Sequence, residues 1–156
     1  MGSDSDAEVM SQACAALDEL GVKYQMVVAS AHRSPERTRE VVTSSEREGA
    51  AVFIAGAGMA AHLPGVVASL TARPVIGVPL AGGALQGVDA LYAIVQMPPG
   101  IPVATVAIGG ARNAGILAAQ ILATGDADLA TRLREDRIAM AAAVAQKSKK
   151  VEKSTR

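Results

Sequence analysis

The stretch AAVFIAGAGMAAHLPGVVASLTARPVIGVP, residues 50–79, decides the fold class of this chain. Two short apolar runs, 50–56 and 74–79, are typical of strands that are buried on both faces. Between them, residues 63–71 have the composition of a short helix. A helix that joins two fully apolar strands predicts a parallel pair, because parallel strands require a crossover connection of this kind.

The alternation of helix and strand extends outward from this unit in both directions. The joins are short, which predicts a single α/β sandwich with a parallel sheet. The spacing of apolar residues, the capping signals and the Gly and Pro positions predict helices over 6–20, 35–49, 63–71, 87–97, 113–125 and 126–150, and strands over 23–30, 50–56, 74–79 and 101–108.

A first strand is missing from this pattern. The chain starts at a Gly-Ser turn and a capped helix, with Ser5 and Glu8 at capping-box spacing, where a strand should just have ended. The first strand of an open parallel sheet is usually central. We therefore expect a gap in the middle of the sheet. Either the true start lies upstream of Met1, or this chain is an atypical and less stable version.

Composition excludes several classes of partner. The 156 residues carry 15 basic and 15 acidic groups, so no overall field attracts nucleic acid or a membrane surface. One cysteine, no signal peptide and no apolar run of about 18 residues favour a cytoplasmic protein. With 15 Gly and 2% aromatic residues, burial must come from closely packed backbones.

The charge is unevenly distributed along the chain. The last ten residues hold five basic groups and one acid, which leaves ten basic and 14 acidic residues in the rest. We expect one catalytic domain over 1–146 and a basic, frayed tail over 147–156.

Three polar or glycine-rich loops are expected at the carboxyl ends of the strands, where open parallel sheets bind ligands. GSDSD, residues 2–6, offers hydroxyls and free N–H groups at a helix start, which suit a phosphate. Its Asp6 is placed to accept hydrogen bonds from sugar hydroxyls. A simple helix cap explains the same residues, so the loop alone does not establish a site.

The other two loops hold both histidines of the chain. SAHRSP, residues 30–35, places His32 beside Arg33, a proton-transfer group beside a forked phosphate donor. GAGMAAHLPG, residues 56–65, surrounds His62 with small residues against which a flat ligand can lie. Ordinary loop histidines remain the alternative. The glycine loop lacks the Lys-Ser/Thr ending of a phosphate-binding Walker loop, and no ligand pattern supports a metal site.

Taken in order, the motifs resemble those of the PurE family of purine-biosynthesis enzymes, in its bacterial mutase class. The resemblance covers residues 1–122 and rests on GSDSD, SAHRSP, GAGMAAHLPG, PVIGVP, GVDALYAIVQMPPGIPVATVAIG and NAGILAAQIL. It implies a flavodoxin-like three-layer α/β/α sandwich, a homo-octamer with sites at subunit junctions, and no cofactor or metal. It also implies transfer of a carboxylate from the exocyclic nitrogen of 5-(carboxyamino)imidazole ribonucleotide to C4.

The resemblance assigns roles to individual residues. His32 would be the general acid and base. Ser3, Asp6, Ser30 and Arg33 would hold the ribose and phosphate, and the base and carboxylate would lie against Ala57, Gly58, His62 and Leu63. Met59 departs from the family pattern, which more often has a glycine there, and Arg112 adds a charge without an assigned role.

Two other functions stay open at this point. One is direct carboxylation of aminoimidazole ribonucleotide by CO₂, although Arg33 instead of lysine favours the mutase. The other is a phosphate-ligand binding module without activity.

Overall fold

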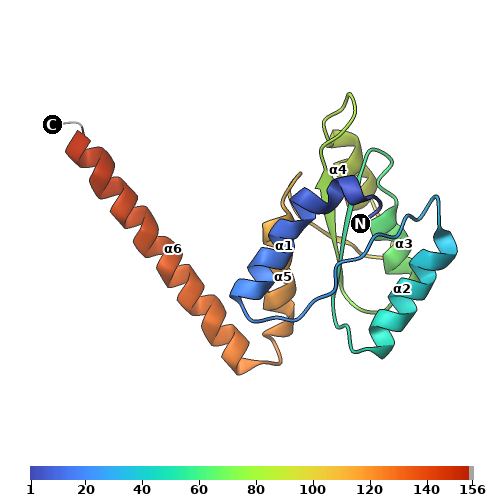
Figure 1. Cartoon of the computed structure of the whole chain (residues 1–156), viewed down its shortest axis with the longest axis horizontal. Helices are drawn as coiled ribbons and strands as arrows, with labels where there is room; N and C mark the ends of the chain where they lie inside the picture. Colours follow the sequence, from blue (N-terminus) through green and yellow to red (C-terminus); the bar gives the residue numbers. More distant parts are fainter. Residues whose placement is uncertain (155–156) are drawn as a thin grey trace.

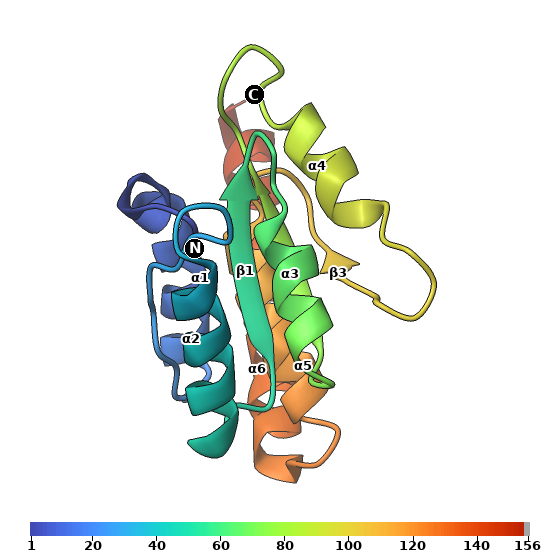
Figure 2. The same cartoon turned by 90° about the vertical axis from the view of Figure 1, so that its right-hand side faces the viewer.

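A parallel three-stranded sheet lies between two layers of helices in the computed structural model, which describes residues 1–154 (Figures 1 and 2). The strands are β1 (Phe53–Gly58), β2 (Val75–Leu80) and β3 (Ala104–Thr105), in the order β1-β2-β3. Phe53 pairs with Val75 and Ile76 with Ala104. This arrangement confirms the predicted α/β sandwich with its parallel sheet.

Each face of the sheet has its own hydrophobic core. On one face, β2 packs against α1 (Ala7–Glu19) and α5 (Ala111–Leu122), through Ile76, Val78 and the alanines of both helices. On the other face, β1 packs against α2 (Pro35–Arg47), α3 (Leu63–Leu70) and α4 (Val88–Val95). The short 3₁₀ helix η1 (Asp4–Asp6) precedes α1.

Small residues allow close approach of backbones, as the composition predicts. A Cβ added to Gly115 of α5 would lie 2.6 Å from the carbonyl oxygen of Ala13 in α1. Arg112 ties the same two helices together, because its Nη1 and Nη2 donate to the Glu19 carboxylate at 3.1 and 2.6 Å. The hydrogen bonds from Arg112 lower the pKa of Glu19. Their contribution to stability is therefore present above the ordinary glutamate pKa and is lost as the pH falls through the lowered one.

Two predicted strands are wrong in whole or in part. Residues 23–30 are extended but form no strand, because a strand requires a ladder of hydrogen bonds to a neighbouring strand, and no strand within residues 1–154 pairs with this segment. Its backbone bonds to Met1 alone at Val27 and Ala29, which is too short a contact for a ladder. The strand predicted over 101–108 is reduced to Ala104–Thr105. Pro102, at the start of that run, has no N–H for a ladder.

The last helix, α6 (Ala127–Ser154), projects away from the body of the molecule (Figure 1). Its basic end, which we expected to be frayed from residue 147, is helical as far as Ser154, and the final two residues of that predicted tail lie outside the described part. Along it, Ile138, Val144 and Val151 are exposed. None of the helices within residues 1–154 combines the length and apolar character that crossing a membrane requires.

Candidate active site

The first loop is a helix cap whose serine hydroxyls are hydrogen-bonded within the loop. The Ser3 side chain accepts a hydrogen bond from the Ser5 N–H at 3.3 Å, and the Ser3 N–H donates to the Asp6 carboxylate at 3.1 Å. These reciprocal bonds form a capping box. Asp6 therefore has the helix-cap role that the sequence left open as an alternative. This role is compatible with ribose binding, because a carboxylate accepts more than one hydrogen bond.

Arg33 joins the second loop to the first. Its Nη2 donates to the Gly2 carbonyl at 3.1 Å, and its Nε donates to the Ser30 hydroxyl at 3.4 Å. The Ser30 hydroxyl also accepts from the Arg33 N–H at 3.2 Å. Two loops that are about 30 residues apart in sequence therefore form one polar wall.

A pocket of about 500 Å³ opens at this wall. It is lined by Gly2, Ser3, Asp4, Val28, Ser30, Arg33, Ser34 and Arg37. The two guanidinium groups and the start of α2 concentrate positive potential there, which suits a phosphate. Three of the four residues assigned to ribose and phosphate, Ser3, Ser30 and Arg33, line this pocket.

Arg37 is a pocket residue that the sequence analysis missed. Its Nε donates to the Val28 carbonyl at 3.1 Å, which holds the guanidinium beside the pocket. A signal was available, because Arg37 lies in the first turn of the helix that Pro35 begins, four residues after Arg33.

The third loop brings the two histidines together. His62 directly precedes α3, and its Nδ1 lies 2.8 Å from Nε2 of His32. The rings meet edge to face, with centroids 4.9 Å apart and an angle of 80° between their planes. Both side chains are exposed. One ring nitrogen must donate and the other accept, so the pair holds one proton between two imidazoles that a ligand can reach.

The other residues predicted for the base pocket, Ala57, Gly58 and Leu63, have small or buried side chains. Ala57 and Leu63 are buried, at 8% and 6% exposure, within the core beneath His62. Gly58 ends β1, and a Cβ there would lie 3.2 Å from the Leu80 carbonyl oxygen. Gly58 thus allows β1 and β2 to approach closely at their carboxyl ends, in the segment that leads to His62. No group of three His, Cys, Asp or Glu side chains in the described part of the chain has the arrangement of a metal site.

Met59 occupies a left-handed backbone position, with φ of 53°. Its side chain is 60% exposed and lies near Gly83. This conformation explains why glycine is expected there, since a Cβ is penalised at positive φ.

Replacing Met59 by glycine is therefore expected to raise the free energy of unfolding by about 0.5–1 kcal/mol. Urea denaturation measures the change. Met59→Ala is the control, because it shortens the side chain but keeps the Cβ. Equal stability of the two variants would contradict the backbone explanation.

Comparison with known proteins decides the family. A family model described as AIR carboxylase matches residues 1–143. The chain belongs to the AIR carboxylase family. The resemblance drawn from the ordered motifs is thus confirmed, and relatives in this family carry two different names.

The relatives that are named as mutases match this chain over most of its length and over most of their own. The N5-carboxyaminoimidazole ribonucleotide mutase of Thermotoga maritima is 51% identical over 152 residues, covering 97% of this chain and 89% of that protein. The Bacillus subtilis protein of the same name is 56% identical over 139 residues, covering 88% and 86%.

A relative with the other name is a longer protein. The phosphoribosylaminoimidazole carboxylase of Saccharomyces cerevisiae is 48% identical over 152 residues, which cover 97% of this chain but 27% of that protein. Among solved structures, Treponema denticola PurE superimposes with a TM-score of 0.84 at 27% identity, covering 96% of this chain and 94% of that one.

Proposed function

We propose that the chain is an N5-carboxyaminoimidazole ribonucleotide mutase, which moves a carboxylate from the exocyclic nitrogen of its substrate to ring carbon C4. The contact between His32 and His62, 2.8 Å apart and beside a cationic pocket, carries the proposal. A carboxylate transfer on a ribonucleotide requires a proton-transfer group near a phosphate site, and the histidine pair and the pocket supply these two parts. The names of the relatives that match most of both chains support the same activity.

The chemistry requires two proton transfers, one to the exocyclic nitrogen and one from C4. Loss of the carboxylate from the exocyclic nitrogen releases CO₂, and that nitrogen takes up a proton. Attack of C4 on the CO₂ then leaves a proton on C4 that a base must remove. We assign both transfers to His32, since an imidazole gives and takes protons near neutral pH. The hydrogen bond to His62 fixes the orientation of the His32 ring. His62 also offers a second imidazole that can accept a proton.

The other assigned residues bind the substrate. Arg33 and the Ser3 and Ser30 hydroxyls are placed for the phosphate and ribose, with Arg37 as a further cation that we add to the set. Asp6 is assigned to the ribose. Ala57, Gly58 and Leu63 are assigned to the wall that holds the base and the CO₂, where small apolar groups exclude water.

The direct carboxylase is the competing activity, since a relative carries that name. Purified chain is expected to convert 5-(carboxyamino)imidazole ribonucleotide without added bicarbonate. Rates are measured with this substrate and with aminoimidazole ribonucleotide plus bicarbonate. Turnover of the second mixture alone would contradict the proposal.

We also propose a cytoplasmic homo-octamer with sites at subunit junctions. The exposed apolar residues of α6 support association, because this helix projects from the body of the molecule and its apolar side chains are not buried against it. Multi-angle light scattering is expected to give about eight times the chain mass of 15.8 kDa. A stable monomer at assay concentration would contradict association.

A further inference from the structure

The loop between β2 and α4, residues 81–87, projects beyond the sheet at the carboxyl ends of the strands (Figures 1 and 2). Its sequence, AGGALQG, contains three glycines and no charged residue. The two ends of the loop touch, because a Cβ at Gly87 would lie 3.2 Å from the Ala81 Cα. A loop that is closed at its neck in this way can move as a unit, since few contacts hold the part beyond the neck.

This loop begins beside the loop that carries His62. Gly58 ends β1 and pairs with Leu80, which ends β2, so the two loops leave the sheet at neighbouring points. Neighbouring strands lie about 4.7–4.9 Å apart, and five residues extend over about 16–18 Å at most, so the outer part of the loop can reach the histidine. The loops already touch, because a Cβ at Gly83 would lie 3.7 Å from Met59 Cγ and 3.9 Å from its Sδ.

The loop is held weakly in its present position. Among the described residues, 82–86 form hydrogen bonds only within the loop and to the start of α4. Gln86 Nε2 donates to the Gly83 carbonyl at 2.8 Å, and the Val88 N–H donates to the Leu85 carbonyl at 3.0 Å. Gln86 has a φ of 50°, a left-handed conformation that its Cβ disfavours. Two of the glycines are also left-handed, at 59° and 92°, and glycine accepts the changes of φ that a hinge requires.

Leu85 is the large apolar side chain of this loop, and it is 60% exposed. The two histidines of the site are exposed as well. Movement of the loop toward the histidine pair would bury the leucine and would remove water from the two imidazoles. Both changes are favourable once a ligand lies against them, because apolar surface leaves water and polar contacts strengthen in a drier site.

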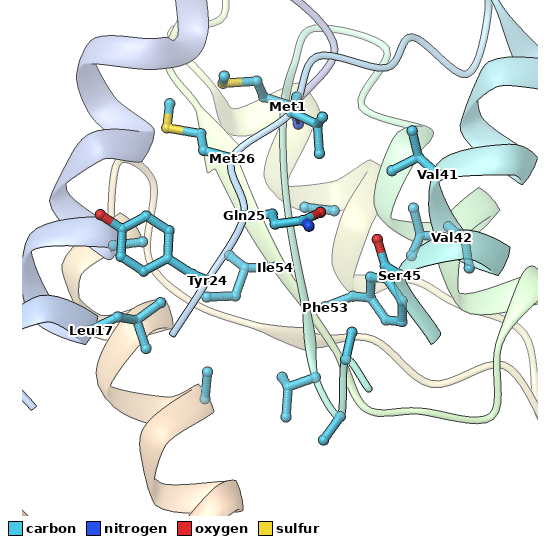
Figure 3. A pocket seen from close by; sticks show the side chains of 18 of the residues that line it. Met1, Leu17, Tyr24, Gln25, Met26, Val41, Val42, Ser45, Phe53 and Ile54 are labelled. Atoms are coloured by element: carbon cyan, nitrogen blue, oxygen red, sulfur yellow. Dashed lines mark hydrogen bonds between the residues drawn. The ribbon is translucent and has the colours of Figure 1, made fainter. Parts of the chain in front are cut away.

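The proposed reaction requires a closed site. The CO₂ released from the exocyclic nitrogen is small and neutral, and it must stay near C4 until the new C–C bond forms. A second cavity, of about 660 Å³, lies between the extended segment 22–29 and β1 (Figure 3), but neither histidine lines it. This cavity therefore does not hold CO₂ beside the reacting atoms. Closure of a loop over the site is a general means of excluding water and retaining a reactive intermediate.

We propose that residues 81–87 form a lid that folds over the histidine pair when the nucleotide binds, with Leu85 as the side chain that retains CO₂. This role rests on the proposed function. The neck at Ala81 and Gly87 is the hinge, and the contact between Met59 and Gly83 marks the point at which the open lid meets the histidine loop. The lid needs no charge, because the molecule that it retains is neutral.

A tryptophan at the tip of the lid reports its closure. The chain has no tryptophan, so Leu85→Trp gives a single fluorophore. Tyr92→Trp is the matched control, because Tyr92 of α4 is 59% exposed but lies outside the lid. The probe is aminoimidazole ribonucleotide, which lacks the carboxylate and is not turned over without bicarbonate. Its addition is expected to shift the emission of Leu85→Trp to shorter wavelength and to abolish most of its quenching by acrylamide, with no change in Tyr92→Trp.

Label exchange measures retention of CO₂. Each variant converts unlabelled 5-(carboxyamino)imidazole ribonucleotide in ¹³C-bicarbonate buffer, with carbonic anhydrase present to equilibrate CO₂ and bicarbonate. Mass spectrometry then gives the labelled fraction of the product. Leu85→Ala is expected to raise this fraction several-fold over the natural chain, because released CO₂ escapes and labelled CO₂ replaces it. Tyr92→Ala, the control, is expected to leave it unchanged.

The outcomes separate the lid from the reaction. Nucleotide binding in calorimetry without a change in the emission of Leu85→Trp would overturn the lid and leave the proposed reaction standing. The same shift in Tyr92→Trp would also overturn it, since the change would not belong to the loop. Equal labelled fractions for Leu85→Ala and Tyr92→Ala would overturn the role in retaining CO₂. Closure without any turnover of the carboxylated substrate would contradict the proposed reaction instead.

Discussion

His32→Asn is expected to lower kcat by about 10²–10⁴-fold, because it removes the group that moves the proton. Asparagine keeps a polar side chain of similar size but cannot exchange a proton near neutral pH. Substrate binding, measured by calorimetry, should change little, because the pocket lined by Arg33 and Arg37 does not include His32. A binding module without activity would show binding by both proteins and turnover by neither.

His62→Asn is the matched comparison for this experiment. It removes the partner that lies 2.8 Å from His32 Nε2 but leaves the imidazole assigned to proton transfer. We expect a smaller loss of kcat and a displaced pH–rate profile, since the hydrogen bond to His32 changes. A His32→Asn enzyme with near-normal kcat would show that His32 is not the acid and base.

Arg33→Met is expected to raise KM by about 10–100-fold, which corresponds to the loss of one or two charge-assisted hydrogen bonds to phosphate. The effect on kcat should be smaller, because phosphate contacts are made equally in the ground state and the transition state. Arg33→Lys should fall between, since it keeps the charge but not the forked donor. Steady-state kinetics at fixed ionic strength measures all three proteins.

Arg39→Met is the control for this series. Arg39 is also exposed on α2 but does not line the phosphate pocket. Arg39→Met removes the same charge as Arg33→Met. An equal rise in KM in both variants would indicate that the overall charge of this surface attracts the phosphate, and not a local contact with Arg33. Because Arg33 also holds the Gly2 carbonyl, the Tm of each variant is measured beside its KM.

The helices and most of their ends were predictable from local signals. Pro35 at the start of α2, Pro64 near the start of α3 and the capping box at Ser3 act within one helical turn, so no distant contact is needed to place them. The apolar runs that became β1 and β2 were equally clear. The order of the loop motifs was enough to identify the family before any coordinate was known.

Strand formation at 23–30 was not predictable from its composition. Its residues favour a strand, but the backbone forms one only when a neighbour supplies the ladder. Whether that neighbour is present depends on another part of the fold, and here the place beside the segment is a cavity.

By itself, the sequence determined the fold class, the three loops and the residue types of the site. Only the tertiary structure placed His32 against His62, joined Arg33 to the Gly2 carbonyl and brought Arg37 to the pocket. The physical reason is the separation along the chain of the residues that interact. Caps, periodicity and turns depend on neighbours along the chain, whereas a contact between side chains 30 residues apart depends on how the sheet sets the ends of separate elements side by side.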